Sequence, residues 1–223
     1  MRDGGRLTAA IEVLTEIETR HKPVRLAMKN WGEGARYAGS KDRAFISGLV
    51  LDVLRRRRSL GWRMGDDSIR AAVLATLHLH WGWPLDRLAD AAGDEVHGHG
   101  PLTDAERQAL AAPRDLADAP PPVRGDYPDW LEPSFIRAFG DDRGAEAAAL
   151  SERAPVDLRV NTNKTDPVRA LKALTTFDAQ PPGLLPNALR VAAPAAAERS
   201  GAVEAIPQFS KGWFEVLDLE PAL

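Results

Sequence analysis

Hydrophobic residues in the first 110 positions of the chain recur at the spacing of amphipathic helices. Residues 6–20 place apolar side chains on one face and glutamates among the polar positions. Residues 68–85 are apolar nearly all round, which predicts the buried central helix of a bundle. Thr103, followed three residues later by Glu106, is a capping-box pattern that predicts the start of another helix. Helices joined by short loops, with no alternating strand pattern before residue 150, predict an all-α first domain.

A further helix is predicted over residues 40–58, with Ser40 or Asp42 at its start. Its apolar stripe comprises Phe45, Ile46, Leu49, Val50, Val53 and Leu54. The stripe ends where four consecutive arginines begin, and cations at the C-terminus of a helix interact favourably with its dipole. We expect Gly61 to end this helix.

The pattern changes in the second half of the chain. Residues 113–128 are rich in proline, which predicts a spacer in extended polyproline geometry along the surface. Asp129 is expected to cap a helix over residues 129–140. A further helix is predicted over residues 142–153.

Beyond Pro155, residues 156–161 alternate between apolar and polar side chains, which predicts a half-buried strand. Thr165 or Asp166 is expected to cap a helix that has Pro167 in its first turn. Residues 187–193 and 212–216 are expected to form further strands, whereas residues 192–206 have no clear preference. We therefore predict a helical domain over 1–125 with a linker over 113–128, an α+β subdomain over 129–215, and a tail over 216–223.

Composition excludes several classes of protein. The chain has no cysteine, so disulfides, thiolate metal sites and cysteine nucleophiles are excluded. It has neither a run of about 20 apolar residues nor a secretory signal at its start, so we expect a cytoplasmic protein without membrane contact. The histidines lack the spacing and companion ligands of a metal site, so no metal is predicted.

Basic and acidic residues are unevenly distributed along the sequence. The formal net charge is only -3, yet residues 36–70 contain nine basic and four acidic side chains. Guanidinium groups suit phosphate oxygens, so this segment predicts contact with RNA. The candidates here are Arg55, Arg56, Arg57, Arg58, Arg43, Lys41 and Arg63. The alternative is a solvated helix end whose arginines only balance the dipole and nearby acids.

A second group of candidates follows the first predicted strand. Arg159 and Asn161 share one face by strand alternation, and Lys164 follows closely. One interpretation turns this face toward RNA or toward another domain. The other gives Asn161 a conformational role, closing a turn by side-chain to backbone hydrogen bonding.

Three stretches carry a resemblance to a known family: "YPDWLEPSFIRAFG", "RAPVDLRVNTNKTDPVRALKAL" and "FSKGWFEVLD". In this order they resemble the bacterial RsmB/Sun family of RNA cytosine-C5 methyltransferases. Residues 1–125 resemble, more loosely, the NusB-like RNA-binding domain that precedes the enzyme in this family. The resemblance implies an all-α NusB-like helical bundle followed by a small α+β subdomain, with RNA, and specifically 16S rRNA, as partner.

The same resemblance implies limits on this chain. The family binds S-adenosylmethionine through a loop of the Asp-x-Cys-x-Ala-x-Pro-Gly type and uses two cysteines in catalysis, and neither feature occurs in this sequence. We therefore expect an RNA-binding N-terminal portion that holds no cofactor and is inactive alone, truncated before the catalytic domain. One alternative is a stand-alone NusB-like module in transcription antitermination or RNA–protein assembly. Another is a purely structural or protein-interaction domain.

Overall fold

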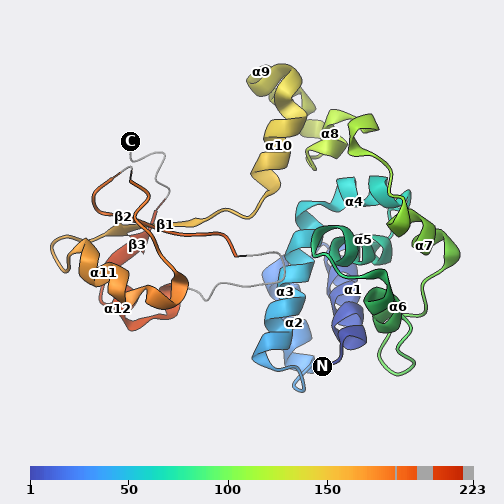
Figure 1. Ribbon diagram of the computed structural model, residues 1–223, viewed down its shortest axis with the longest axis horizontal. Helices are drawn as coiled ribbons and strands as arrows, with labels where there is room; N and C mark the ends of the chain where they lie inside the picture. Colours follow the sequence, from blue (N-terminus) through green and yellow to red (C-terminus); the bar gives the residue numbers. More distant parts are fainter. Residues whose placement is uncertain (184, 195–202, 218–223) are drawn as a thin grey trace. The chain divides into compact units, whose positions relative to one another are not determined.

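The computed structural model describes residues 1–183, 185–194 and 203–217, and the chain divides into two compact units, Met1–Glu152 and Arg153–Leu223. The first unit is helical, and the second combines short helices with a small antiparallel sheet (Figure 1). This agrees with the predicted helical part followed by an α+β part. Within the described residues, no helix is both long and apolar enough to cross a membrane.

The α-helices of the first unit are α1 (Asp3–Arg20), α2 (Val24–Gly34), α3 (Ser40–Arg55), α4 (Arg57–Met64), α5 (Ile69–Ala75), α6 (Leu85–Ala92), α7 (Asp104–Ala111), α8 (Pro121–Arg124), α9 (Glu132–Phe139) and α10 (Arg143–Ser151). A π-helical turn spans Thr76–His80, and 3₁₀ turns span Leu116–Asp118, Asp129–Leu131 and Gly140–Asp142.

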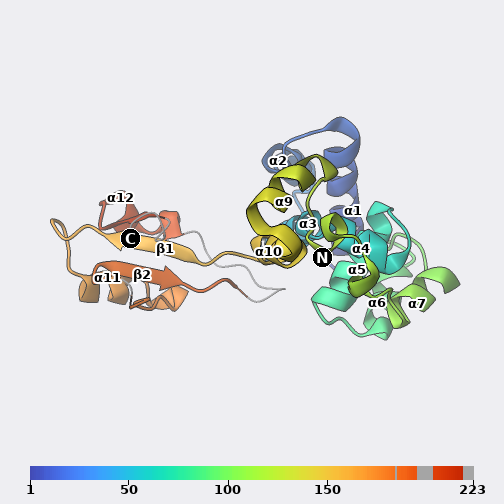
Figure 2. The same cartoon turned by 90° about the horizontal axis from the view of Figure 1, so that it is seen from above.

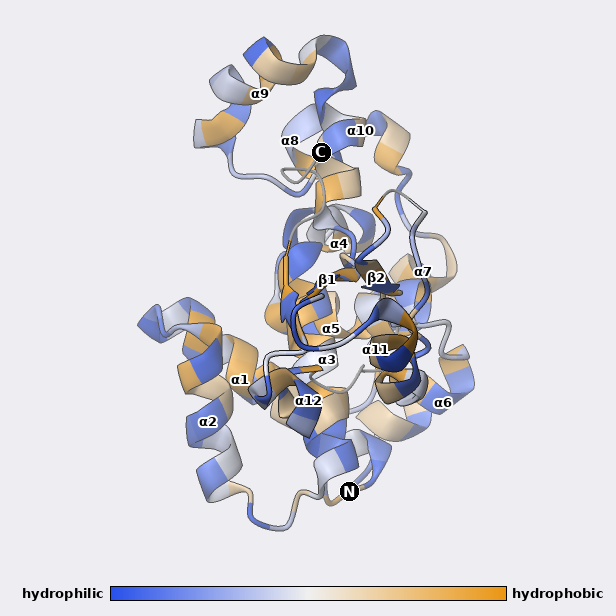
Figure 3. Cartoon of the chain, turned by 90° about the vertical axis from the view of Figure 1, so that its left-hand side faces the viewer, coloured by the Kyte–Doolittle hydropathy of each residue, from blue (hydrophilic) through white to orange (hydrophobic). Residues whose placement is uncertain are grey.

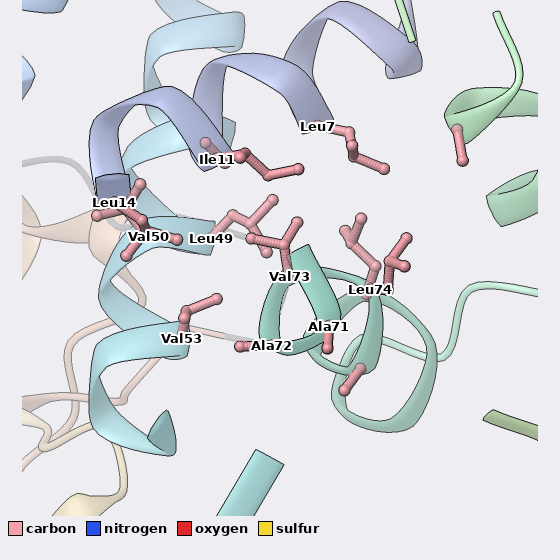
Figure 4. Close-up of a cluster of buried hydrophobic side chains, with 14 of the residues drawn as sticks. Leu7, Ile11, Leu14, Leu49, Val50, Val53, Ala71, Ala72, Val73 and Leu74 are labelled. Atoms are coloured by element: carbon pink, nitrogen blue, oxygen red, sulfur yellow. The ribbon is translucent and has the colours of Figure 1, made fainter. Parts of the chain in front are cut away.

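The core of this unit lies between α1, α3 and α5. Leu7 and Leu14 of α1 point toward Leu49 of α3 and Leu74 of α5, and all four side chains are fully buried (Figure 4). The helices bury one face because their apolar positions recur every three or four residues. Figure 3 shows the consequence on α1 and α2, which carry both hydrophobic and hydrophilic bands. The predicted amphipathic helices are therefore confirmed.

The helix that carries the arginines ends earlier than predicted. α3 stops at Arg55, and α4 begins at Arg57 with Gly61 buried inside it. The helix stop is Gly65, which adopts the left-handed conformation with φ 64°. The prediction that Gly61 ends the helix was therefore wrong. Gly61 is needed instead for close packing, because a Cβ atom there would lie 2.2 Å from the Asp67 carboxylate.

Residues 68–85 form less regular structure than the predicted continuous helix. α5 passes into the π-helical turn, in which the backbone N–H of Trp81 donates to the carbonyl oxygen of Thr76 at 2.9 Å. This turn directs the indole N–H of Trp81 to the fully buried Asp52 carboxylate at 2.8 Å. The Trp81 ring packs edge-on against Phe45, with centroids 5.0 Å apart.

Part of the proline-rich segment is helical rather than extended. Pro121 lies in the first turn of α8, where a missing N–H costs no helical hydrogen bond. Asp126 follows the helix, and its Oδ1 accepts from the backbone N–H groups of Arg58 and Ser59 at 2.9 and 2.8 Å. The expected polyproline conformation was therefore wrong for residues 121–124, because these residues pack against the start of α4.

Asp129 was wrongly expected to cap the next helix. It begins a 3₁₀ turn ahead of α9, and its carboxylate pairs with Arg58 instead. α9 and α10 belong to the first unit by their contacts. The domain boundary predicted between residues 125 and 129 remains a prediction.

The second unit contains the strands β1 (Val156–Val160), β2 (Ala188–Val191) and β3 (Phe214–Val216), the helices α11 (Pro167–Ala173) and α12 (Pro207–Ser210), and 3₁₀ turns at Thr175–Phe177 and Val203–Ala205. Among the described residues the strand order is β2-β1-β3, with both pairs antiparallel. Figure 2 shows β1 beside β2. The predicted strands and the cap at Asp166, which accepts from the Arg169 N–H at 2.9 Å, are confirmed.

Alternation along β1 fixes the two sides of this sheet. Leu158 and Val160 are buried, and they pack in one cluster with Leu189 of β2 and Phe214 of β3. α11 and α12 lie on the same side of the sheet as one another (Figure 1) and contribute to this cluster. Arg159 faces the other way, into solvent. Most of the ambiguous stretch 192–206 and the tail from residue 218 lie outside the described residues.

Candidate nucleic-acid interface

The run of arginines between α3 and α4 is engaged in contacts within the protein. Arg57 donates to Glu18 Oε1 at 2.6 Å and to the carbonyl oxygen of Asp67 at 2.5 Å. Arg58 donates to the carbonyl oxygen of Tyr127 at 2.5 Å and pairs with Asp129 at 2.8 Å. These contacts tie the start of α4 to α1 and to the segment after α8.

The two preceding arginines are also paired. The Arg56 side chain is 12% exposed, and its Nη2 lies 2.7 Å from Glu152 Oε1. Arg55 Nη1 lies 3.4 Å from the carboxylate of the buried Asp52. Each of the four arginines therefore lies beside a carboxylate. This arrangement agrees with the alternative interpretation, in which the arginines balance nearby acids. Their contact with RNA remains a prediction.

The other basic candidates of the first unit have different surroundings. Arg43 is directed inward, and its guanidinium donates to the carbonyl oxygens of Gly32, Ala35 and Ala38 at 2.8, 3.1 and 3.0 Å. Arg43 therefore holds the loop between α2 and α3. Lys41 is exposed on the first turn of α3. Arg63 is half-buried on α4.

In the second unit, the predicted residues Arg159, Asn161 and Lys164 line one hollow. It has a volume of about 530 Å³ and lies beside β1 and β3. Its other lining residues are Val160, Thr162, Asn187, Gly212, Phe214 and Glu215. The structure therefore brings together all three candidates that the sequence predicted in this unit.

The hollow is shaped by a turn after β1. The Asn161 side-chain oxygen accepts from the backbone N–H of Asn163 at 3.2 Å, so Asn161 has the predicted turn-closing role. Lys164 Nζ donates to the carbonyl oxygen of Lys211 at 3.1 Å. The next residue, Gly212, has φ 71°, and a Cβ atom there would lie 2.7 Å from Lys164 Nζ. The positive φ favours glycine at this position, and the absence of a Cβ atom leaves room for the ammonium group beside the backbone.

The hollow offers hydrogen-bonding groups and a small positive charge. Arg159 Nε donates to Glu215 Oε1 at 2.7 Å across the β1–β3 pair, so its charge is balanced by a neighbouring strand. Lys164 adds one further cation, and Asn161, Thr162 and Asn187 add neutral polar groups. Such a lining can bind a phosphate and the polar edge of a nucleotide.

Asp42, Asp126 and Tyr127 are among the groups whose pKa values are shifted. The Arg6 guanidinium holds the pKa of Asp42 below its usual value near 3.8. Burial raises the pKa of Asp126, against the hydrogen bonds that it accepts from Ser59 and the Arg58 N–H. Burial and the neighbouring Glu132 raise the pKa of Tyr127 to about 12. Tyr127 therefore stays protonated at neutral pH, and its hydroxyl group donates a hydrogen bond to Glu132 Oε2 at 2.5 Å.

Sequence reasoning missed two features of the first unit. Asp126 caps the start of α4 although it lies 67 residues from Ser59 in the sequence, and no local sequence pattern predicts such a contact. Tyr37, on the loop between α2 and α3, is 74% exposed. Its position between Arg36 and the predicted Lys41 is visible in the sequence, but its exposure is not.

Comparison with known proteins finds similarity in part of the second half of the chain. Residues 127–198 match the ferredoxin-like domain of RsmF/B-like methyltransferases. The chain is also 30% identical over 95 residues to "Probable ribosomal RNA small subunit methyltransferase B" of Synechocystis sp.. This match covers 41% of the chain and 20% of the relative. The resemblance to the RsmB/Sun-type methyltransferases is therefore confirmed, and it concerns their N-terminal portion.

A solved structure shares the fold. The crystal structure of PH0851 aligns with 97% of this chain and 53% of its own chain, with a TM-score of 0.51 and 14% sequence identity. The chain thus spans about half the length of this structural relative and one fifth of the length of the curated relative.

Proposed function

We propose that this chain is the RNA-binding N-terminal part of an S-adenosylmethionine-dependent 16S rRNA (cytosine-C5) methyltransferase. Its role is to position rRNA for methyl transfer by a catalytic domain outside the described units. The protein acts in the cytoplasm. That catalytic domain binds S-adenosylmethionine, which supplies the methyl group.

The observation that carries this proposal is the hollow beside β1 and β3. Arg159, Asn161 and Lys164 converge there, and β1 lies inside the segment that matches the RsmF/B-like domain. The polar lining includes Lys164, which has no carboxylate partner among the residues that the structure describes, and such a lining suits the sugar-phosphate backbone and the polar edges of bases. The similarity to a protein named as a ribosomal RNA methyltransferase supports rRNA as the ligand.

We further propose that the helical unit is a NusB-like module. The packing of α1, α3 and α5 around one core supports a bundle of this kind. A stand-alone NusB-like module has no use for the α+β unit, and the match over residues 127–198 therefore favours the methyltransferase role over the alternative.

Binding of fluorescently labelled 16S rRNA fragments, measured by anisotropy at two salt concentrations, tests the proposal. Affinity is expected to fall steeply with salt because bound phosphates release counterions. Lys164→Gln is expected to weaken binding and to lower the salt slope by about one unit of log affinity per log salt. Lys172→Gln is the matched control, since Lys172 is exposed on α11 and does not line the hollow.

Each outcome bears on a different part of the proposal. Absence of rRNA binding by the wild-type chain would overturn the function. Equal affinities of the Lys164→Gln and Lys172→Gln variants for rRNA would show that the RNA binds outside the hollow. Calorimetry with S-adenosylmethionine is expected to show no heat of binding, and micromolar affinity would contradict the assignment of the cofactor to another domain.

A further inference from the structure

Two consecutive residues on the first turn of α3 hold the loop between α2 and α3. The Asp42 carboxylate is buried and accepts from Arg6 Nε and Nη2 at 2.9 and 2.7 Å. It also accepts from the backbone N–H of Gly39 at 3.1 Å. Arg43 binds three carbonyl oxygens of the same loop and of the end of α2. The loop is therefore fixed at both ends, and it is fixed against α1.

The fixed loop and the first turn of α3 that follows it carry exposed cations. Arg36 and Lys41 are both exposed, and within the part of the chain that the structure describes neither forms an ion pair. They differ in this from Arg55 to Arg58, each of which lies against a carboxylate. Phosphate binding by Arg36 and Lys41 therefore requires no internal ion pair to break.

An aromatic ring stands between these cations in the sequence. The Tyr37 side chain is 74% exposed although the loop that bears it is held in place. It lines a hollow of about 650 Å³ between the start of α1 and the loop after α6, together with Arg2, Thr8, Glu12 and His97. This volume falls within the range of about 300–1,000 Å³ that is usual for sites of small molecules.

The combination suits one kind of ligand. A flat base can stack on an exposed tyrosine ring, and such stacking tolerates any base because every base has a π-face. Arg36, next to Tyr37 in the sequence, and Lys41, four residues beyond it, are cations that suit the phosphates on either side of that base. A base can enter the hollow only when it is unpaired, because bases in an A-form duplex are stacked and paired.

We propose that Arg36, Tyr37 and Lys41 form a binding site for an unpaired RNA nucleotide. The Tyr37 ring stacks on the base in the hollow, and Arg36 and Lys41 bind the adjoining phosphates. Arg43 and Asp42 are positioning residues that hold the loop in place. This inference rests on the proposed rRNA-binding function and assigns a specific surface of the helical unit to it.

The test compares a 12-nucleotide single-stranded oligouridylate with a 12-base-pair RNA duplex by anisotropy. Tyr37→Ala is expected to weaken binding of the single strand about fivefold or more, and Tyr37→Phe to retain it, because the phenyl ring still stacks. Binding of the duplex is expected to be unaffected by either change. Arg36→Gln combined with Lys41→Gln is expected to lower the salt slope for the single strand by about one or two.

Arg25→Gln is the matched control, because Arg25 is an exposed cation at the opposite end of α2 from the loop. If the wild-type chain binds 16S rRNA fragments and these variants bind the single strand as tightly as the control does, the inference is wrong and the proposed function stands. If the wild-type chain binds no RNA, both are overturned. A Tyr37→Phe variant as weak as Tyr37→Ala would exclude stacking as the mode of contact.

Discussion

The Arg43 guanidinium lies so close to Gly32 that a side chain at position 32 would collide with it. Arg43 Nη2 donates to the Gly32 carbonyl oxygen at 2.8 Å, and a methyl group on Gly32 would lie 2.3 Å from Arg43 Nη1. A residue that the sequence marks as a contact for RNA thus acts within the protein. It organises the loop that presents Arg36 and Tyr37.

Arg43→Lys is expected to lower the free energy of unfolding by about 1–3 kcal/mol. Lysine keeps the positive charge but cannot donate to three separate carbonyl oxygens in the planar geometry of a guanidinium, and hydrogen bonds from charged donors contribute about 1.5–3 kcal/mol each. Urea denaturation followed by circular dichroism measures the loss. Lys41→Arg, on the exposed side of the same helical turn, is the control. Unchanged stability of Arg43→Lys would mean that the loop does not depend on this contact.

Asp42→Asn is expected to destabilise the protein at neutral pH and to have less effect in acid. Arg6 lowers the pKa of Asp42 in the folded state, so ionised Asp42 stabilises the fold above its unfolded pKa, near 3.8. That contribution is lost as the pH falls through the lower folded pKa. Free energies of unfolding measured between pH 2.5 and 7 for wild type and variant should therefore converge at the acid end.

Asp90→Asn provides the comparison for this experiment, because Asp90 is exposed on α6. A difference between wild type and Asp42→Asn that stays constant with pH would show that the charge of Asp42 is not what stabilises the first turn of α3.

Asp126 is expected to show the opposite dependence on pH. Burial raises its folded pKa, so its stabilising contribution is complete below the unfolded pKa and is lost as the pH rises through the folded pKa. Asp126→Asn keeps an oxygen for the N–H groups of Arg58 and Ser59 and is compatible with the positive φ of 55° at this position. Its stability relative to wild type should therefore rise with pH.

Asp126→Ala removes the cap of α4 and is expected to cost about 0.5–2 kcal/mol. Thermal unfolding of both variants at pH 4 and pH 7 separates the two effects. If Asp126→Asn is as unstable as Asp126→Ala at pH 7, the ionised carboxylate itself stabilises α4 and the expected sign is wrong.

Arg57→Ala is expected to lower the free energy of unfolding by about 1 kcal/mol, because it removes a partly exposed ion pair with Glu18. Glu18→Gln should produce a loss of similar size, since it breaks the same pair from the other side. Chemical denaturation measures both. If Arg57→Ala instead weakens binding of 16S rRNA and leaves stability unchanged, the arginine run contacts RNA as the sequence predicts.

Much of this fold was predictable because its determinants are local. The apolar spacing around Leu7 and Leu14 predicts α1, the pair Thr103 and Glu106 predicts the start of α7, and alternation from Val156 to Val160 predicts β1. Each of these patterns depends on residues within a few positions of one another. The convergence of Asn161 and Lys164 is local as well, since the turn after β1 brings them together.

Tertiary structure decided whether each charged side chain forms an internal ion pair or faces solvent. The sequence shows four arginines in a row, but it does not show that Glu18, Asp129 and Glu152 lie against them, because these acids come from distant parts of the chain. The proline-rich segment folds into α8 for the same reason, since Asp126 finds its partners on α4. Local spacing therefore determined most of the helices and the strands described, with α8 as an exception. Long-range packing decided which cations are balanced internally and which, such as Arg36 and Lys41, face solvent.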